Sequence, residues 1–420
     1  MEKVITANNY TSASDKVRSF TLYKNIVVKI LSGMNKGELQ MTFHDGEVIK
    51  FGGTDKSVKA SIKIINPRMF KRIVLFGDIG FGESYVDGDW ETDNIANVIS
   101  WMILNTENNP AVTGGRKKYS PISFLKFINR IYHKANINTK NRSRKNISDH
   151  YDLNNDFFKL WLDESLTYSS GIFEGTDDLH MAQIAKYDRL CRVLKINSDD
   201  HVLEIGSGWG GFSIYAAENF GCKITTTTIS KEQFNYAKNL IREKNLEDKI
   251  EIILKDYREL SGIYDKIVSI EMLEAVGHEF LPAYFSKVDQ LLKPDGAVGL
   301  QVITSHDSNY DQLRKSVDWI QKHIFPGSLL PSVGAINSAV NKTGNLYLHD
   351  LKNIGLDYAK TLRTWRSRFN SRLDEVLKLD FDNSFIRKWN YYLSYCEAAF
   401  GMRNISAVQM VYTRPNNRGL

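Results

Sequence analysis

A glycine cluster is the stretch of this 420-residue chain whose residue types and spacing best suit ligand binding. It follows the apolar run 202–205, and its glycines Gly206, Gly208 and Gly211 precede an apolar, helix-like segment. Glycine permits sharp turns and lets backbone N–H groups approach a ligand closely. A strand, a glycine-rich turn and a helix N-terminus form the nucleotide-binding corner of a doubly wound sheet. The spacing also fits a dinucleotide fingerprint, so the cluster alone leaves the ligand open.

Polar and acidic side chains follow the next predicted strands. Thr228 ends the second strand, Tyr257 follows the third, and Glu271 and Glu274 follow the fourth. In open α/β sheets, ligands bind outside the carboxyl ends of the strands, so these side chains and the glycine cluster should share one site. A nicotinamide enzyme would place an acid where Thr228 stands, and a P-loop would need Gly-Lys-Ser/Thr after the glycines. The sequence disfavours the first class and excludes the second.

The elements that must position these residues alternate as in an α/β fold from His150 onward. The predicted strands are 202–205, 223–228, 250–254, 266–270, 297–302 and 407–412. Helical runs such as 233–244 and 281–292 separate them, with a turn expected at 293–296. This pattern predicts a mostly parallel sheet. A helical insertion over about 305–390 is expected to cap the strand ends.

The N-terminal part predicts a small α+β domain over residues 1–110. A helix is expected at 17–31, and the alternating runs 38–43 and 48–51 flank an Asp-Gly turn, which is a strong hairpin signal. Residues 60–65 alternate again. The stretch 77–90 is rich in glycine and acid, but it lacks the spacing of an EF-hand calcium loop. Turns that join helices and strands are the expected structure there.

The segment 111–148 is strongly basic. No acid lies between Glu107 and Asp149, and apolar residues recur at helical spacing over 122–131. Its cations are Arg116, Lys117, Lys118, Lys126, Arg130, Lys134, Lys140, Arg142, Arg144 and Lys145. Such a segment suits an anionic membrane surface, and it equally suits a solvated linker whose apolar stripe docks on a neighbouring domain. No motif for nucleic-acid binding supports a third interpretation.

Composition limits the remaining possibilities. The chain is 42% hydrophobic and 25% charged, with a net charge of +6, so it can bury a large core in two or three domains. Three widely spaced cysteines, without a Cys-x-x-Cys pair, argue against disulfides or a zinc site and favour a reducing compartment. Neither a signal peptide nor a long apolar span is present. We therefore expect a cytoplasmic protein without a metal site.

Residues 202–211, with Trp209 inside them, and residues 228–233 together resemble one group of S-adenosylmethionine-dependent methyltransferases. The group is the cyclopropane-fatty-acyl-phospholipid synthases and their mycolic-acid relatives. Further segments that resemble this family are 77–90, 150–158, 166–170, 324–332 and 391–400. The resemblance spans about 37–415 in one order. It implies a class I (Rossmann-like) methyltransferase domain over 149–420 with a helical cap insertion.

The resemblance also implies which residues hold S-adenosylmethionine. Gly206 and Gly208 would face its methionine part, and Thr228 and Gln233 would hold the ribose. Tyr257 would lie against the adenine, while two residues N-terminal to the domain's first strand would close over the cofactor. The whole set implied for cofactor binding is Tyr168, Ser169, Glu204, Gly206, Gly208, Thr228, Ser230, Gln233 and Tyr257.

The implied reaction adds a methylene group to a cis double bond of a membrane phospholipid acyl chain. Methyl transfer to an alkene leaves a carbocation that must lose a proton, and loss from the new methyl group closes a cyclopropane ring. Loss from a neighbouring carbon would instead give a branched chain. The site therefore needs an apolar channel, aromatic faces or carboxylates beside the cation, and a base near the methyl group.

The family's base is thought to be a bicarbonate ion held by Cys, Glu, His and Tyr side chains. The matching positions here are Ser170, Glu274, Gln301 and Tyr358. Glu271 stands where the bacterial form has glycine, and a second carboxylate would repel an anion. We therefore expect Glu271 to be the base in place of bicarbonate, against the alternative that Glu271 is structural and bicarbonate still binds. Residues 271–279 resemble the plant-type and the methyl-branching enzymes of actinobacteria.

Three functions remain open from the sequence. The first is cyclopropane formation, and the second is a methyl- or methylene-branching reaction on the same substrate. The third is an inactive lipid-binding protein, because Ser170 and Gln301 replace two groups that could hold an anion. The substrate implies peripheral contact with the inner face of a membrane. The oligomeric state, with a homodimer as one option, is not readable from the sequence.

Overall fold

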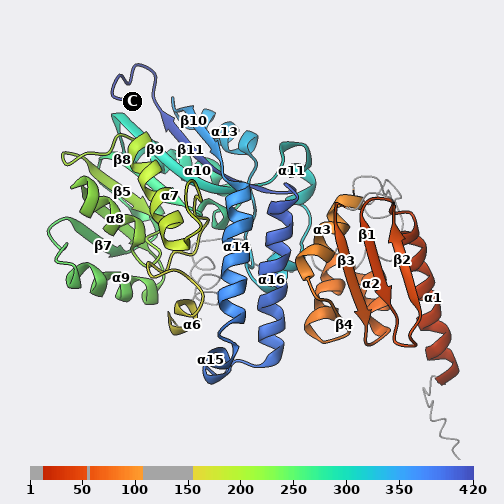
Figure 1. Cartoon of the computed structure of the whole chain (residues 1–420). Coiled ribbons are helices and arrows are strands. Elements are labelled where there is room, and N and C mark those ends of the chain that lie inside the picture. The colour runs from red at the N-terminus through yellow and green to blue at the C-terminus, as the bar shows by residue number, and fades with distance from the viewer. Residues whose placement is uncertain (1–12, 54–56, 107–154) are drawn as a thin grey trace, which may run out of the picture. The chain divides into compact units, whose positions relative to one another are not determined.

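The chain forms two compact units, residues 1–125 and 126–420, which we describe separately. A computed structural model describes residues 13–53, 57–106 and 155–420 (Figure 1). The predicted basic segment 111–148 and the first residues of the 150–158 motif lie outside these ranges. The predicted domain boundaries near 110 and 148 therefore stay predictions.

The N-terminal unit is a small α+β domain, as predicted. Its sheet has the strand order β2-β1-β3-β4, with β1 antiparallel to β2 and parallel to β3. Leu39 and Met41 of β1 and Ile62 of β3 are buried in its core. The elements are α1 (Ala13–Ser32), β1 (Glu38–Thr42), β2 (Val48–Gly52), β3 (Lys59–Ile64), α2 (Arg68–Val86), β4 (Trp90–Glu91) and α3 (Ile95–Thr106).

The prediction of turns over 77–90 was wrong for most of that stretch. Helix α2 runs from Arg68 to Val86 and has one break, at Gly77, where φ is 61° and ψ is −131°. That conformation is accessible to glycine alone at low cost, so one glycine interrupts a helix that otherwise continues. Ile79, Gly80, Phe81 and Gly82 are all buried, so the helix is enclosed on more than one side after the break.

The C-terminal unit is built on a seven-stranded sheet with the order β10-β11-β9-β8-β5-β6-β7. Neighbours from β7 to β9 are parallel, and β11 runs antiparallel to both β9 and β10. The strands are β5 (His201–Ile205), β6 (Lys223–Thr228), β7 (Ile250–Leu254), β8 (Tyr264–Ile270), β9 (Leu292–Thr304), β10 (Tyr347–Asn353) and β11 (Ser406–Thr413). This confirms the predicted sheet.

Helices cover both faces of this sheet (Figure 1). Val202 of β5 packs with residues of α7, α8 and α9, whereas Leu203 and Ile205 pack with α10 and α13. Alternate residues of a strand point to opposite faces, so one apolar strand supplies both cores. The helices named here are α6 (Asn155–Lys159), α7 (Leu179–Val193), α8 (Gly211–Phe220), α9 (Lys231–Glu243), α10 (Leu281–Leu291) and α13 (Val333–Asn341).

The expected helical insertion is correct in its helices but not in its extent. Helices α14 and α16 lie side by side and antiparallel, with α15 at their shared end (Figure 1). However, residues 347–353 form β10, a sheet-edge strand whose alternate residues are exposed. Besides α13, the helices of this region are α11 (Asp307–Leu313), α12 (Trp319–His323), α14 (Gly355–Asn370), α15 (Leu373–Lys378) and α16 (Asn383–Gly401).

The turn predicted at 293–296 falls inside strand β9, which begins at Leu292. Pairing with β8 passes from Tyr264–Leu292 to Lys266–Ala297, so residues 293–296 leave the ladder as a bulge at the place where the turn was expected. Across the parts of the chain that the structure describes, no helix combines the length and apolar character needed to cross a membrane.

Candidate active site

Glu271 lies where strand β8 ends, at the carboxyl edge of the sheet. Its φ is 51°, a left-handed backbone conformation that is unfavourable for a residue with a side chain, by about 1–2 kcal/mol. Its backbone N–H donates to the carbonyl of Gln301 at 2.7 Å, which extends the β8–β9 ladder by one residue. Glu271 is thus the first residue after β8, and its strained backbone directs the side chain into the site. Backbone strain of this kind is common at functional positions.

The carboxylate of Glu271 accepts three hydrogen bonds. The backbone N–H of Ser170 and Nε2 of Gln301 both donate to Oε1 at 2.9 Å, and the hydroxyl of Tyr358 donates to Oε2 at 2.7 Å. These are three of the four positions that the resemblance assigns to an anion site. The structure therefore brings Ser170, Gln301 and Tyr358 together, with the Glu271 carboxylate in their midst. The Ser170 hydroxyl itself donates to the carbonyl of Gly171.

A buried lysine lies close to this carboxylate. Lys186 of α7 is fully buried, and its Nζ donates to Oγ of Ser169 and Oε1 of Gln183, both at 2.6 Å. Burial lowers the pKa of Lys186 to about 7, and the charge of Glu271 opposes that shift. Burial raises the pKa of Glu271, while its hydrogen bonds and the charge of Lys186 act in the opposite direction.

Lys186 is a functional candidate that the sequence reasoning missed. It stands on α7 four residues after Ala182 and four before Leu190, and both of these are fully buried. A lysine in the apolar stripe of an amphipathic helix was the available signal. The hydroxyl of Ser169 accepts from Nζ of Lys186, and its carbonyl accepts from Nε2 of Gln183. Its contact with the cofactor stays a prediction.

Glu274 is the second carboxylate of the site. One of its oxygens, Oε1, accepts a hydrogen bond from the backbone N–H of Ile303. The other, Oε2, is buried without a partner among the described residues. Burial, and then the charge of Glu271, raise the pKa of Glu274 to about 8. A protonated Oε2 would be a donor without an acceptor, so this oxygen is available to a group that enters the site.

Tyr358 lies in a cluster of aromatic rings. Its ring stacks on Phe400 with centroids 4.4 Å apart and meets Trp365 edge-on at 6.1 Å. The Tyr168 ring lies 5.4 Å from Trp365, and its hydroxyl shares a hydrogen bond of 2.8 Å with that of Tyr392. Electron-rich ring faces attract cations, so this wall suits a carbocation. Trp365 was not singled out from the sequence, although it follows Tyr358 by two turns of α14.

The glycine cluster forms the turn predicted for it. Gly206, Gly208 and Gly210 have φ values of 97°, 49° and 96°. The N–H groups of Gly206 and Ser207 donate to the carbonyl of Thr227, which ties the turn to strand β6. A Cβ at Gly208 would meet no atom within 4 Å, so open space lies beside the backbone. The turn therefore has the glycine geometry and the space that a cofactor with a polar methionine end requires.

Glu204, predicted among the cofactor residues, is hydrogen-bonded to the two elements next to this turn. Its Oε2 accepts hydrogen bonds from the hydroxyls of Ser213 in α8 and Thr226 in β6. Burial raises the pKa of Glu204 to about 7. The carboxyl group thus joins β5, β6 and α8, which fixes the turn between them.

The predicted ribose and adenine residues lie at the neighbouring strand ends. Thr228 donates its hydroxyl hydrogen to Oε1 of Gln233 at 3.0 Å. Ser230 caps helix α9 by accepting from the N–H of Gln233. The Tyr257 ring, in the 3₁₀ turn η1 (Tyr257–Glu259), lies 5.3 Å from that of Tyr284 in the core. All of these roles toward the cofactor remain predictions, and Ser230 has the cap as a structural role.

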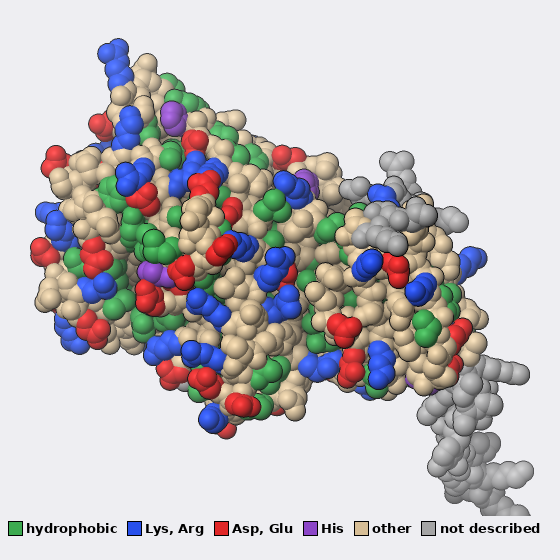
Figure 2. Space-filling view, viewed as in Figure 1, with side chains coloured by type: hydrophobic (Ala, Val, Ile, Leu, Met, Phe, Trp, Pro, Cys, Tyr) green, Lys and Arg blue, Asp and Glu red, His purple; other side chains and the backbone are tan. Residues whose placement is uncertain are grey.

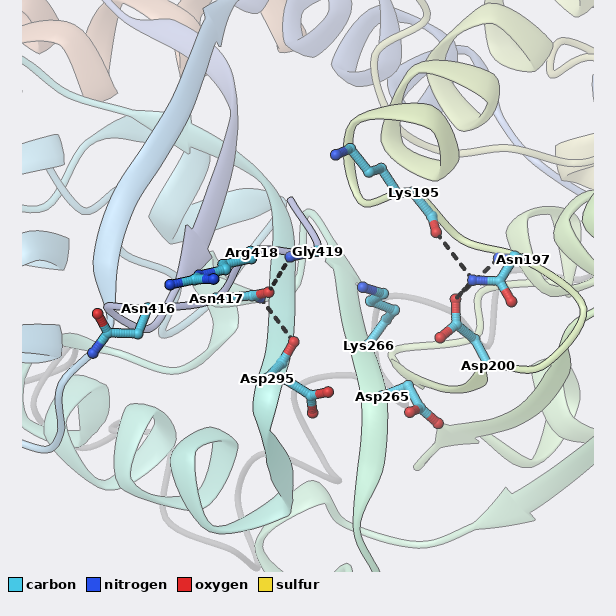
Figure 3. A pocket seen from close by; sticks show the side chains of 10 residues that line it. All are labelled: Lys195, Asn197, Asp200, Asp265, Lys266, Asp295, Asn416, Asn417, Arg418 and Gly419. Carbon is cyan, nitrogen blue, oxygen red and sulfur yellow. Dashed lines mark hydrogen bonds between the residues drawn. The ribbon is translucent and has the colours of Figure 1, made fainter.

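A hollow of about 580 Å³ lies at the opposite edge of the sheet, near the amino ends of β5, β8 and β9 (Figure 3). Its lining mixes three cations with three carboxylates and chain-terminal groups. The residues are Lys195, Asn197, Asp200, Asp265, Lys266, Asp295, Asn416, Asn417, Arg418 and Gly419. Neither Glu271 nor the glycine turn is among them, so this hollow is separate from the candidate active site.

Comparisons with known proteins agree with this geometry. The family model of mycolic acid cyclopropane synthetase matches residues 138–410. The chain is 36% identical to tuberculostearic acid methyltransferase of Mycobacterium tuberculosis, over 90% of this chain and 88% of that protein. It is also 36% identical to cyclopropane-fatty-acyl-phospholipid synthase of Escherichia coli, over 87% and 90%.

Solved structures give the same result. A mycolic acid cyclopropane synthase complexed with SAH and CTAB superposes with a TM-score of 0.61 at 28% identity, covering 64% of this chain and 98% of that one. A cyclopropane synthase from Mycobacterium tuberculosis gives 0.60 at 26% identity, with the same coverage. These relatives support the class I methyltransferase fold that the resemblance implied.

Replacing Gly206 by alanine should weaken S-adenosylmethionine binding. The φ of 97° resists a side chain, and the new Cβ would lie 3.4 Å from Cγ of Met272. Relief of that strain would move the N–H groups of the turn. A loss of about 1.4 kcal/mol or more corresponds to at least a tenfold rise in Kd, which calorimetric titration would measure.

Gly221 offers a matched control. It also has a positive φ, 72°, but it ends helix α8, away from the carboxyl edge of the sheet. Gly221→Ala should lower the free energy of unfolding through similar backbone strain and leave the Kd unchanged. Equal Kd values for Gly206→Ala and the wild type would contradict the assignment.

Proposed function

The chain belongs to the mycolic acid cyclopropane synthetase family, and from this premise we propose that it converts a cis double bond of a phospholipid acyl chain to a cyclopropane ring. It is an S-adenosylmethionine-dependent C-methyltransferase. Escherichia coli cyclopropane-fatty-acyl-phospholipid synthase covers both units of this chain, and it carries the substrate class in its name. The observation that supports the chemistry best is the Glu271 carboxylate, held by three donors beside an aromatic wall.

In this proposal, aromatic rings stabilise the carbocation and the Glu271 carboxylate removes the proton. S-adenosylmethionine supplies an electrophilic methyl group, which the turn at Gly206 and Gly208 and the Thr228–Gln233 pair would present. The alkene carbon would bond to that methyl group as the bond between the methyl carbon and sulfur breaks. S-adenosylhomocysteine would leave as a neutral thioether, and the positive charge would pass to the neighbouring carbon of the acyl chain. The ring faces of Tyr358 and Tyr168 stabilise this charge. Glu271 takes one proton from the transferred methyl carbon, and the freed electron pair closes the ring.

Glu271 acts as the base without bicarbonate in this proposal. A bicarbonate ion would need donors, but the Ser170 N–H, Gln301 and Tyr358 already donate to Glu271. A second anion at van der Waals distance from that carboxylate would also be repelled. The substitution at Gln301 is thereby explained, since an amide can donate to a carboxylate without carrying a charge. No step of the proposed reaction uses bicarbonate.

Turnover should depend on the Glu271 carboxylate itself. Glu271→Gln keeps the shape of the side chain but cannot take a proton, so kcat should fall by about 10²–10⁴-fold. The Kd for S-adenosylmethionine should change little, because the cofactor residues are untouched. Initial rates with a cis-unsaturated phospholipid and the methyl-transfer product would measure this.

Glu397 is a suitable control for that experiment. It is another buried carboxylate, paired with Arg363 and Arg366 on the α14–α16 helix pair. Glu397→Gln should reduce stability while kcat stays within a few-fold of the wild type. Near-normal turnover of Glu271→Gln would refute the assignment of the base.

The product should carry a ring rather than a branch. Expression in a host without such an enzyme should add one CH₂ to unsaturated phospholipids, with loss of alkene reactivity, as lipid mass spectrometry before and after ozonolysis would show. A gain of one CH₂ with alkene reactivity retained would mean a methylene branch, and no gain would favour a lipid-binding protein without activity.

Contact with an anionic membrane surface is proposed through the basic segment 116–134. On the visible face of the larger unit, basic and acidic side chains are mixed rather than segregated (Figure 2). The segment 116–134 instead carries Lys and Arg without a single Asp or Glu. Polybasic segments bind anionic lipid with about 1 kcal/mol per cation.

Replacing Arg116, Lys117 and Lys118 together by glutamate should therefore weaken vesicle binding. Cosedimentation with vesicles that contain phosphatidylglycerol should show the loss, and it should shrink at high salt, where the wild type also binds less. Turnover with detergent-dispersed substrate should be unchanged. Equal vesicle binding by the wild type and the triple glutamate variant would contradict the proposed membrane contact. A finding that these three residues instead form a contact between subunits would contradict it as well.

A further inference from the structure

Two glutamines are buried on neighbouring strands of the large sheet, the second and third from its β10 edge, an unusual place for amide side chains. Gln301 of β9 and Gln409 of β11 are both fully buried and are directly opposite each other in the antiparallel pair. A buried amide is costly unless its donors and acceptor are used. Each of these two amides is hydrogen-bonded at both ends, so they form part of a connected network.

The network runs from the sheet edge to the base. Arg189 of α7 donates from Nη1 to Oε1 of Gln409 at 2.9 Å. Nε2 of Gln409 donates to Oε1 of Gln301 at 3.0 Å. Nε2 of Gln301 then donates to Oε1 of Glu271 at 2.9 Å. Asp350 of β10 pairs with the other nitrogen of the Arg189 guanidinium and holds it in place.

The direction of every bond in this chain follows from Arg189. A guanidinium is always charged and only donates, so the oxygen of the Gln409 amide must face it. The NH₂ group of Gln409 then faces Gln301, whose oxygen must accept. That leaves only the NH₂ group of Gln301 to face Glu271. A second acceptor at each amide, the carbonyls of Lys186 and Ser170, agrees with these orientations.

We propose that Gln409, oriented by Arg189, is a positioning residue that forces Gln301 to present its NH₂ group to Glu271. The proposal rests on the role of Glu271 as the base. An amide in the opposite orientation would place its oxygen against the carboxylate and disfavour the ionised form that accepts a proton. The fixed charge of Arg189 thus selects the protonation state of the base through two neutral amides.

Other groups also face Glu271 and set the background for a test by pH. The cation is Lys186 from α7, and its charge favours the carboxylate form. Burial, and to a smaller extent the charge of Glu271, raises the pKa of Glu274 and of the phenols of Tyr358 and Tyr187. None of these four residues is altered in the variants below, so their contribution is constant.

Gln409→Glu is the decisive variant, because a carboxylate can only accept. It would still accept from Arg189, but it would require Gln301 to turn its NH₂ group away from Glu271. Activity needs ionised Glu271 and is lost as pH falls through the pKa of that group, so a raised pKa moves the acidic limb of kcat/KM upward. We expect an upward shift of about one pH unit, or about tenfold lower kcat/KM on that limb.

The negative charge that Gln409→Glu introduces could act on Glu271 directly, and a second background separates the two effects. Methionine at position 301 has no amide to turn, so Gln409→Glu in Gln301→Met should shift the limb by less than half as much as in the wild type. Equal shifts in the two backgrounds would overturn the proposal, because the amide would then carry none of the effect.

Gln409→Met is a second test that introduces no buried charge, in case Gln409→Glu does not fold. It removes the donor that fixes Gln301, and kcat should fall several-fold while the KM for S-adenosylmethionine stays constant. Tyr412→Phe is its control: it deletes the hydrogen bond to Asn337 from the other face of β11, and it should lower stability without moving the pH profile. A Gln409→Met enzyme with the wild-type kcat and pH profile would contradict the positioning role.

The pH profile of kcat/KM for Glu271→Gln separates the role of Glu271 as the base from the positioning role of Gln409. If the acidic limb persists in Glu271→Gln, the assignment of the base fails, and the positioning role fails with it. If the limb disappears in Glu271→Gln but neither Gln409 variant moves it in the wild type, the base stands and only the positioning role of Gln409 is overturned.

Discussion

The structure of the site depends on three hydrogen bonds to one carboxylate. Glu271 is placed by a strained residue at the end of β8, and its oxygens are occupied by donors from three other parts of the chain. Ser170 precedes helix α7, Gln301 lies on β9, and Tyr358 lies on α14. A carboxylate in a poorly solvated site is stable only if such donors compensate for lost water. Burial raises the pKa of this carboxyl group, while its three hydrogen bonds and the charge of Lys186 act against that rise.

The polar and apolar requirements of the reaction are met on different sides of Glu271. Behind it lies a buried polar layer that contains Lys186, Gln301 and Gln409, all without exposure to solvent. In front of it stand Tyr358 and Tyr168 with the rings that support them. A carbocation would be quenched by water, so the aromatic side must be dry, while the base needs fixed donors. Separating the two groups of side chains satisfies both demands.

Much of this arrangement could be predicted from the sequence, for identifiable reasons. The parallel strands are short apolar or β-branched runs between amphipathic helices, which is a strong local signal. The glycine turn and the carboxyl-edge positions of Thr228, Tyr257 and Glu271 followed from the general rule for open sheets. Strand β10 was missed because its residue types do not follow its burial: Leu351 is exposed, whereas Asp350 and Lys352 lie on the less exposed face. Its neighbour β11 also lies over fifty residues away in sequence.

The polar network could not be predicted, because its members are local in space only. Arg189, Gln301 and Gln409 are far apart along the chain, and each looks like an ordinary polar residue by itself. Lys186 carries a weak local signal, its place in a buried helix stripe. The hydrogen bonds of Glu204 and Ser169 within the protein could not be predicted either, and their roles toward the cofactor stay predictions. Pairings that tertiary contacts create are not encoded in any short stretch of sequence.

The most direct test of this account is the bicarbonate dependence of the wild-type enzyme. Initial rates would be measured in buffer freed of carbon dioxide and again after bicarbonate is added, at constant pH and ionic strength. If the Glu271 carboxylate takes the place of the anion, the two rates should be equal within error. A rate that falls on depletion and returns with bicarbonate would contradict the central claim, because the base would then come from solution.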